Sequence, residues 1–226
     1  MDPNFPLTWH LQKELAGAGP HFDLTSHSVD LARYLVGDIR KVTGMTANFI
    51  TERPLPDEAA GTFSGTAKDG TGAAARATGP VTVEDAAFMV VEFANGALGS
   101  FEATRFAPGR KNYNSFEIYG SKGSILFDLE RMNELQFFSQ DDPAHAQGFR
   151  TIIATEGGQH DYIDHWWPPG HVIGYEHEFV HAVVDFVNAV VTKTKIEPNF
   201  RDGWKELEVL EAGLRSAETG KAVELA

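Results

Sequence analysis

Apolar residues recur at helical spacing in three parts of the chain. Leu31, Ala32 and Leu35 return to one face of the segment Ser26–Val36, which predicts a helix there. Asp23 precedes this segment as a candidate N-cap, and Gly37 follows it as a candidate C′ residue. The same periodicity predicts two closing helices, Gly174–Thr192 and Arg201–Thr219, with Gly220 ending the second.

Each closing helix has an apolar stripe, which predicts the side that packs on a core. In the first helix the stripe is Phe179, Val183, Phe186 and Val190, with His177, His181, Asp185 and Asn188 on the other side. In the second helix it is Trp204, Leu207, Leu210, Leu214 and Ala217.

Alternating apolar and polar residues fill the middle of the chain. Asn95-Gly96 separates two alternating segments and is the strongest hairpin signal present. A second hairpin is expected around Gly120–Gly123. The expected strands are Lys41–Ile50, Ala86–Phe93, Ala97–Phe106, Ser115–Tyr119, Ser124–Phe127, Glu134–Phe138 and Arg150–Ala154.

The order of these elements predicts an α+β fold with one open, mostly antiparallel β-sheet and helices on one face. We expect a single domain over residues 1–226. Residues 51–80 are rich in Gly, Ala, Thr and Pro, and are expected to form a surface excursion with a weak strand pair.

Composition and charge limit the kinds of molecule and surface to which the chain is expected to bind. The 226 residues carry 19 Lys and Arg against 32 Asp and Glu, a formal net charge of −13. Such a charge disfavours binding to nucleic acid or to an anionic membrane surface. The chain has no cysteine, which excludes disulfides and thiol nucleophiles, and it shows no signal peptide or apolar run of membrane-spanning length. We therefore expect a cytoplasmic protein.

The first candidate for chemistry is Asp23-x-x-x-His27. On one helix this spacing places both side chains on the same face, at the N-terminal end. The helix dipole there favours a neutral imidazole that can accept a proton, and a carboxylate can orient that ring or bind a substrate hydroxyl. The alternative is that Asp23 only caps the helix and His27 lies at the edge of the core.

Two further motifs carry alternatives of their own. His177-Glu178-Phe179-Val180-His181 matches the H-E-x-x-H zinc motif, although no third ligand follows at a fitting distance and a solvated helix face has the same pattern. The loop His165–His171 holds paired tryptophans, which suit stacking on a sugar ring or simply anchor the loop. Gly70–Ala75 only partly resembles a dinucleotide-binding turn, because no apolar strand precedes it.

Taken together, several motifs resemble the Gfo/Idh/MocA oxidoreductases over nearly the whole chain. They are Pro6–Leu11, Ala16–Gly19, Asp23–Gly37, Val83–Asp85, Phe93–Gly99, Ile118–Gly123, Asp202-Gly203 and Arg215–Gly220. Members of that family are two-domain, NAD(P)-dependent dehydrogenases of sugars and polyols. This chain is similar to their C-terminal domain alone, a fold like that of the C-terminal domain of glyceraldehyde-3-phosphate dehydrogenase. Neither the Rossmann glycines nor the family's Glu-Lys-Pro motif has a counterpart here.

The resemblance implies specific roles. His27 aligns with the histidine that exchanges the hydroxyl proton, and Asp23 with the aspartate that contacts the polyol. Trp9, Trp167 and His171 are expected sugar contacts. The chain is expected to bind no cofactor or metal itself, to work with NAD or NADP held by a Rossmann-domain partner, and to form homo-oligomers through its exposed sheet face. Thr25 and Phe22 depart from the family's usual residues, which affects the expected shape of the pocket.

Two other functions stay open at this point. The chain could be a stand-alone sugar-binding module, or a cofactor-free lyase or isomerase that uses Asp23 and His27. A zinc hydrolase through His177 and His181 is the third reading.

Overall fold

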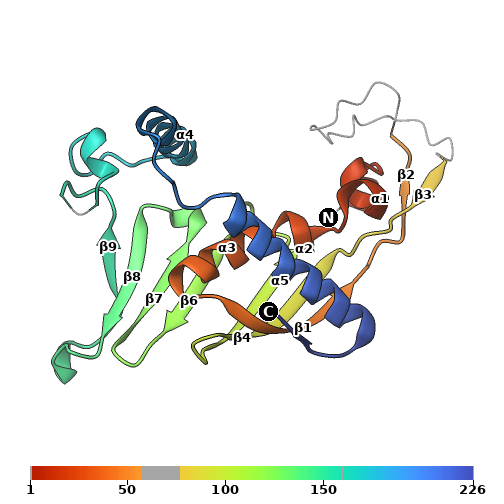
Figure 1. The fold of residues 1–226 in the computed structure, drawn as a ribbon, viewed down its shortest axis with the longest axis horizontal. Coiled ribbons are helices and arrows are strands. Elements are labelled where there is room, and N and C mark those ends of the chain that lie inside the picture. The colour runs from red at the N-terminus through yellow and green to blue at the C-terminus, as the bar shows by residue number, and fades with distance from the viewer. Residues whose placement is uncertain (1, 57–76, 159, 226) are drawn as a thin grey trace. The chain divides into compact units, whose positions relative to one another are not determined.

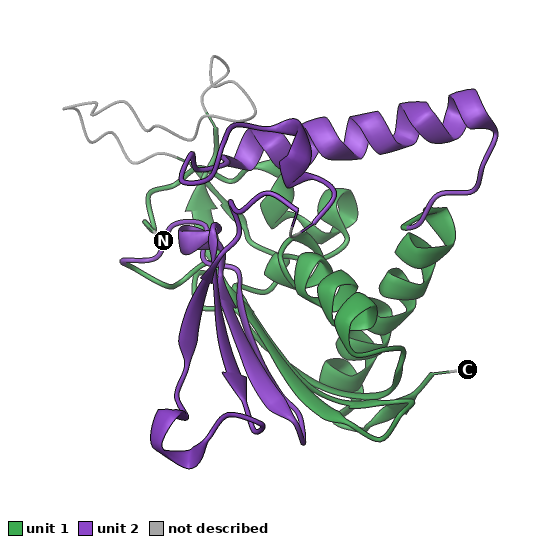
Figure 2. Cartoon of the chain, turned by 90° about the vertical axis from the view of Figure 1, so that its left-hand side faces the viewer, with its two compact units in different colours: residues 1–108, 198–226 green, residues 109–197 purple. Residues whose placement is uncertain are grey.

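The computed structural model describes residues 2–56, 77–158 and 160–225. Their contacts group the chain into two compact units, residues 1–108 with 198–226, and residues 109–197 (Figure 2). Each unit contains a four-stranded antiparallel sheet. The α+β class and the antiparallel pairing predicted from sequence are therefore confirmed, although the strands divide between separate sheets.

The first unit is a sheet covered by helices, with strand order β10-β1-β4-β5 (Figure 1). Its elements in chain order are η1 (Trp9–Leu11), α1 (Lys13–Ala16), α2 (Pro20–Asp23), α3 (Thr25–Leu35), β1 (Ile39–Ala47), β2 (Glu52–Pro54), β3 (Thr78–Pro80), β4 (Ala86–Phe93), β5 (Leu98–Thr104), α5 (Phe200–Thr219) and β10 (Val223–Glu224).

The second unit has strand order β6-β7-β8-β9. Its elements are β6 (Ser115–Tyr119), β7 (Gly123–Asp128), η2 (Leu129–Arg131), β8 (Glu134–Ser139), η3 (Ala144–Ala146), β9 (Arg150–Ile153), η4 (Ile163–His165) and α4 (Tyr175–Thr192).

The turns expected from sequence form as predicted. Asn95-Gly96 joins β4 to β5, with Gly96 at φ +88°, a left-handed conformation that glycine adopts without strain. Gly120–Gly123 joins β6 to β7. The weak strand pair in the 51–80 excursion is the antiparallel pair β2–β3, whereas residues 57–76, and with them Gly70–Ala75, lie outside the described part of the chain.

Helix α5 lies on β1 with its backbone close to the strand (Figure 1). A Cβ added at Gly44 would lie 2.3 Å from the carbonyl oxygen of Gly213. The amide of Gly44 also donates to Oγ of Ser216, at 2.9 Å. Glycine and serine thus allow a helix-to-strand distance that larger side chains would prevent.

This close approach corrects the predicted core face of α5. Leu210 is fully buried as expected, but Trp204 and Leu207 of the predicted stripe are 52% and 47% exposed. The buried residues of α5 are Val209, Leu210, Ala212, Gly213 and Ser216. The face of α5 that contains the small residues Gly213 and Ser216 packs on the sheet. A pattern of apolar residues does not predict this face, because it does not take side-chain size into account.

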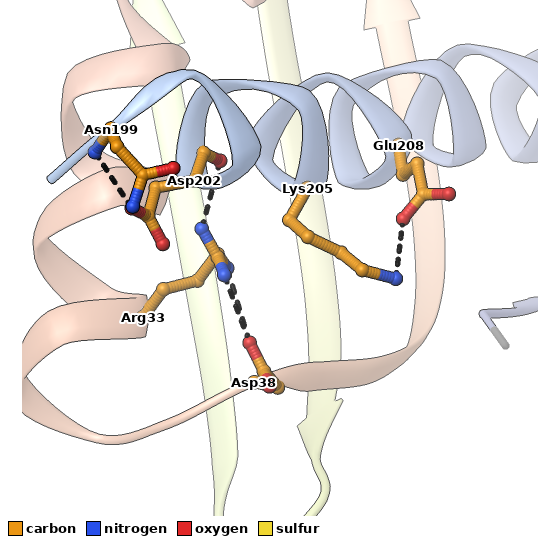
Figure 3. Close-up of polar contacts among 6 residues, drawn as sticks. All are labelled: Arg33, Asp38, Asn199, Asp202, Lys205 and Glu208. Atoms are coloured by element: carbon orange, nitrogen blue, oxygen red, sulfur yellow. Dashed lines mark hydrogen bonds and ion pairs between the residues drawn. The ribbon is translucent and has the colours of Figure 1, made fainter. Parts of the chain in front are cut away.

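Helix α3 is tied to the first turn of α5 by Arg33 (Figure 3). Its guanidinium donates to the carbonyl oxygen of Asp202 at 3.0 Å and to Oδ1 of Asp38 at 3.0 Å, and its side chain is only 12% exposed. Asn199 caps α5, because its side-chain Oδ1 accepts a hydrogen bond from the backbone amide of Arg201. The backbone amide of Asn199 in turn donates to Oδ2 of Asp202. One arginine therefore connects the end of α3, the loop after it and the start of α5.

His21 of α2 has a buried imidazole that contacts α5. It is 1% exposed, and its Nε2 donates to the carbonyl oxygen of Leu210 at 2.7 Å. Within the described residues, Nδ1 has no hydrogen-bond partner. Burial lowers the pKa of His21, an effect that the Leu210 carbonyl and the nearby Glu84 carboxylate partly oppose.

The lowered pKa of His21 predicts lower stability at mildly acidic pH. Below about pH 6.5 the unfolded chain takes up a proton at this ring, whereas the folded chain does not until its lower pKa is reached. The free energy of unfolding should therefore fall as the pH drops through 6.5. Urea unfolding at pH 7.5 and 5.5 measures this loss, which should be smaller in His21→Gln; equal losses in the two proteins would contradict the prediction.

Candidate functional site

Asp23 is the last residue of α2 and forms an ion pair across the unit. Its Oδ2 accepts from Nη2 of Arg105 at 2.6 Å. The predicted N-cap role is wrong: the N-cap of α3 is Leu24, and no side chain caps that end. The reason is that Pro20 begins a separate short helix, which places Asp23 inside a helical turn and not before one.

Asp23 and Trp9 line the same surface hollow, of about 200 Å³. Its lining consists of Trp9, His10, Ala16, Ala18, Phe22, Asp23 and Arg105. The rings of Trp9 and His10 are stacked, with their centroids 3.6 Å apart, and Trp9 remains 41% exposed. The hollow thus combines an aromatic surface with an ion pair, a combination suited to a sugar ring and its hydroxyls.

His27 is the third residue of α3, and its side chain is exposed in the first turn. The prediction that Asp23 and His27 lie on a single helix is wrong, because the helix is interrupted at Leu24, between α2 and α3. The described residues provide no hydrogen bond to the His27 ring, which is also not part of the lining of the hollow. The proton-exchange role of His27 and the hydroxyl-binding role of Asp23 stay predictions.

Trp167 and His171 lie in the second unit, on the loop before α4. Trp167 is 71% exposed, and its ring centroid is 6.4 Å from that of His171. Nδ1 of His171 donates to the carbonyl oxygen of Pro168 at 2.8 Å, which fixes the ring against its own loop. The loop presents both rings to solvent, and their contact with a sugar stays a prediction.

The H-E-x-x-H segment packs against the preceding loop. Nε2 of His181 accepts from the indole Nε1 of Trp166 at 2.5 Å, and the ring of His181 stacks on that of Tyr162. Nδ1 of His177 accepts from the amide of Gly174 at the start of α4. Burial lowers the pKa of His181. Among the described residues no three potential ligands lie close enough together to hold a metal ion.

These contacts correct the predicted core face of α4. The stripe Phe179, Val183, Phe186 and Val190 is between 59% and 61% exposed, and the packed residues of α4 include His177, His181 and Asp185. Asp185 accepts from the hydroxyl of Tyr162 at 2.7 Å. The polar side of α4 thus packs because its groups find aromatic and hydrogen-bonding partners on the loop.

Arg105 is the site residue that sequence reasoning missed. It follows β5, 82 positions after Asp23, and no local motif marks it. His10 was also missed as a site residue, although the motif Pro6–Leu11 contained it. A hairpin prediction places Arg105 at a strand end, but only the packing of α2 on β4 and β5 brings it to Asp23.

The described residues do not fit a dinucleotide cofactor. Such a cofactor is held by a parallel strand, a glycine-rich turn and the start of a helix. Every strand pair in the described ranges is antiparallel.

No helix in these ranges is both long and apolar enough to cross a membrane.

Comparison with known proteins gives one family match and several close relatives. The family model described as the GFO/IDH/MocA C-terminal domain matches residues 1–126. A curated relative, the levoglucosan dehydrogenase of Pseudarthrobacter phenanthrenivorans, is 42% identical over 217 residues. That alignment covers 96% of this chain and 54% of the relative.

Solved structures give the same result. An oxidoreductase domain protein from Kribbella flavida matches with a TM-score of 0.89 at 45% identity, covering all of this chain and 56% of that one. A levoglucosan dehydrogenase in complex with NADH and levoglucosan matches with a TM-score of 0.84 at 39% identity, covering 99% of this chain and 55% of that one. The present chain therefore spans about half the length of the relatives it matches.

Proposed function

This chain belongs to the family of GFO/IDH/MocA C-terminal domains, and we propose that it is the substrate-binding part of an NAD(P)-dependent sugar or polyol dehydrogenase. The observation that carries the proposal is the hollow in which Asp23 lies beside the stacked rings of Trp9 and His10. The relatives support it, since two of the solved structures similar to this chain hold NADH with levoglucosan or L-sorbose.

The chemistry assigned to the chain is binding and proton transfer. Oxidation of a secondary alcohol removes a hydride from carbon and a proton from the hydroxyl group. Asp23 would accept a hydrogen bond from a hydroxyl, and the ring of His27 would take the departing proton. Trp9 would contact an apolar face of the sugar. Trp167 and His171, on the second unit, stay candidate sugar contacts predicted from the sequence.

The hydride acceptor lies outside the described residues. A nicotinamide supplies that chemistry when it is bound, and nothing in the described fold cradles one. We therefore propose that a Rossmann domain, covalently joined or separate, holds NAD or NADP, and that this chain alone has no dehydrogenase activity.

The test has two steps. The purified chain is first titrated with NADH and NADPH while the nicotinamide fluorescence is followed, and no binding is expected. A chimaera is then made from the N-terminal part of the P. phenanthrenivorans levoglucosan dehydrogenase followed by this chain. It should reduce NAD or NADP with levoglucosan or a related sugar. Sugar binding by the chain, together with an inactive chimaera, would instead favour a stand-alone binding module or a cofactor-free lyase or isomerase.

The open face of the β10-β1-β4-β5 sheet supports a proposal about assembly. Alternate residues of neighbouring strands present apolar side chains there, opposite the face that packs on α5. Met45, Phe88, Val90 and Leu98 are 69%, 45%, 61% and 77% exposed. An exposed apolar sheet face of this kind is typical of an interface, and we propose that a second copy of this chain covers it.

Replacing Val90 by glutamate should therefore lower the oligomeric state. A charge in the middle of the apolar face is costly to bury in an interface but costs little in the isolated chain. Light scattering should show a dimer or larger assembly for the unchanged protein and a monomer for Val90→Glu. Tyr34→Glu, on an 85% exposed position of α3, is the matched control and should leave the assembly intact. A monomeric unchanged protein would refute the interface.

A further inference from the structure

Arg105 reaches the hollow as a largely buried cation. Its side chain is 13% exposed, whereas that of Asp23 is 50% exposed. Nη2 of Arg105 lies 2.6 Å from Oδ2 of Asp23, the length of a strong charge-assisted hydrogen bond. The buried partner is thus the arginine, and the carboxylate is the group that faces solvent.

The backbone of Arg105 is fixed by a buried residue. Its amide donates to the carbonyl oxygen of Asp85 at 3.1 Å, and the hydroxyl of Thr104 donates to the same oxygen at 3.3 Å. Asp85 is fully buried, and its Oδ2 accepts from the amides of Phe49 and Ile50 at 2.7 and 2.9 Å. The arginine therefore extends from a rigid junction between β1, β4 and β5.

Asp23 has much less support of its own. It ends a four-residue helix, and its backbone amide donates to the carbonyl oxygen of Gly19. Within the described residues its Oδ1 accepts no hydrogen bond, so the ion pair through Oδ2 is the contact that fixes the carboxylate. The remaining oxygen is available to a ligand on the solvent side.

We propose that Arg105 is the positioning residue of the sugar site, holding Asp23 by Oδ2 so that Oδ1 binds a substrate hydroxyl. The proposal rests on the proposed function, in which Asp23 binds the sugar. Because the charge of Arg105 is matched by Asp23, the hollow is suited to an uncharged polyol and not to a sugar acid. The role of Arg105 is orientation, since a carboxylate in one rotamer loses less freedom on binding.

The first experiment measures the orientation of Asp23 without any sugar. In the full chain, three-bond NMR couplings of Asp23 report its χ1 rotamer. A single rotamer is expected in the unchanged protein and in Arg105→Lys, and averaged couplings in Arg105→Met. Arg33→Met is the matched control, because it removes another well-buried arginine of the same unit, and it should leave the Asp23 couplings unchanged. A single Asp23 rotamer in Arg105→Met would overturn the proposal.

The second experiment titrates the full chain with levoglucosan and follows amide chemical shifts. Arg105→Met should raise the Kd roughly tenfold, and Arg105→Lys should recover part of that loss. Since both residues act through one carboxylate, the double variant Asp23→Asn/Arg105→Met should bind no more weakly than Asp23→Asn alone. Additive losses, or a Kd unaffected by Arg105→Met, would overturn the proposal.

The two experiments separate the two ideas. If the unchanged chain binds no sugar while the Asp23 rotamer depends on Arg105, the proposed function loses support and the positioning of Asp23 by Arg105 stands. If sugar binds and the Asp23 rotamer is indifferent to Arg105, the proposed function stands and the positioning role fails.

Discussion

Replacing His27 by alanine should lower the kcat of the active chimaera by about 100- to 10,000-fold, the usual contribution of a positioned acid–base group. The KM for the sugar should change little, because the proton is transferred in the transition state and the ring contributes little to ground-state binding. Steady-state kinetics with the levoglucosan concentration varied and NAD held at saturation measure both constants.

His145→Ala is the matched control for this result. That histidine is exposed on the short η3 helix of the second unit and has no role assigned in the reaction, so its loss should leave kcat unchanged. A His27→Ala chimaera that turns over at the unchanged rate would remove His27 from the mechanism. A loss confined to KM would make it a sugar ligand and not a proton acceptor.

Gly44→Ala should destabilise the first unit by about 2–4 kcal/mol, one of the largest effects available to a single methyl group. The new Cβ would lie 2.3 Å from the carbonyl oxygen of Gly213 and 3.1 Å from its carbonyl carbon. Both atoms belong to the backbone of α5, so no side-chain rotation relieves the clash. The helix must move off β1, and the packing of Val42 and Leu210 loosens with it.

Urea unfolding of the purified chain measures this change as a lower midpoint. Gly203→Ala is the matched control, because it lies on the same helix α5 with no atom within 4 Å of its added Cβ. It should leave stability unchanged or raise it by up to about 1 kcal/mol, since alanine is the better helix former. An unchanged midpoint for Gly44→Ala would mean that helix and strand are not in backbone contact.

Local signals in the sequence predicted the elements and the antiparallel pairing well. Asn95-Gly96 predicted the hairpin, which forms as a three-residue loop closed by the hydrogen bond from the amide of Phe93 to the carbonyl oxygen of Ala97, with Gly96 in the left-handed conformation. Gly37, at φ +129°, follows the end of α3 as expected. The helix begins at Thr25, one residue before the predicted start, and its N-cap is Leu24 and not Asp23. Turn chemistry depends on adjacent residues and can therefore be read locally.

Packing faces were harder to predict, because they depend on residues far apart in sequence. The apolar stripe of α5 included Trp204, yet the contact with β1 is made by Gly213 and Ser216, whose small size matters more than hydrophobicity. The packed side of α4 contains His181 because Tyr162 and Trp166 lie against it. Apolar periodicity is a property of one helix alone, so it contains no information about the strand or loop on which that helix packs.

The candidate site shows the same division. Asp23 and Trp9 could be selected from their motifs, and the fold brings both to one hollow. Arg105 could not be selected, because its importance comes only from an ion pair with a residue 82 positions away. Long-range pairs of this kind leave no periodic trace in a single sequence.

The connection of α3 to α5 has a consequence for the order in which the protein is made. The helix that carries His27 is synthesised before α5, and the carbonyl oxygen to which Arg33 donates belongs to Asp202, 169 positions after that arginine (Figure 3). On the ribosome, α3 therefore lacks this support until the start of α5 has emerged. A chain interrupted before Asn199 would contain every candidate site residue and still lack the helix that holds His27 in place.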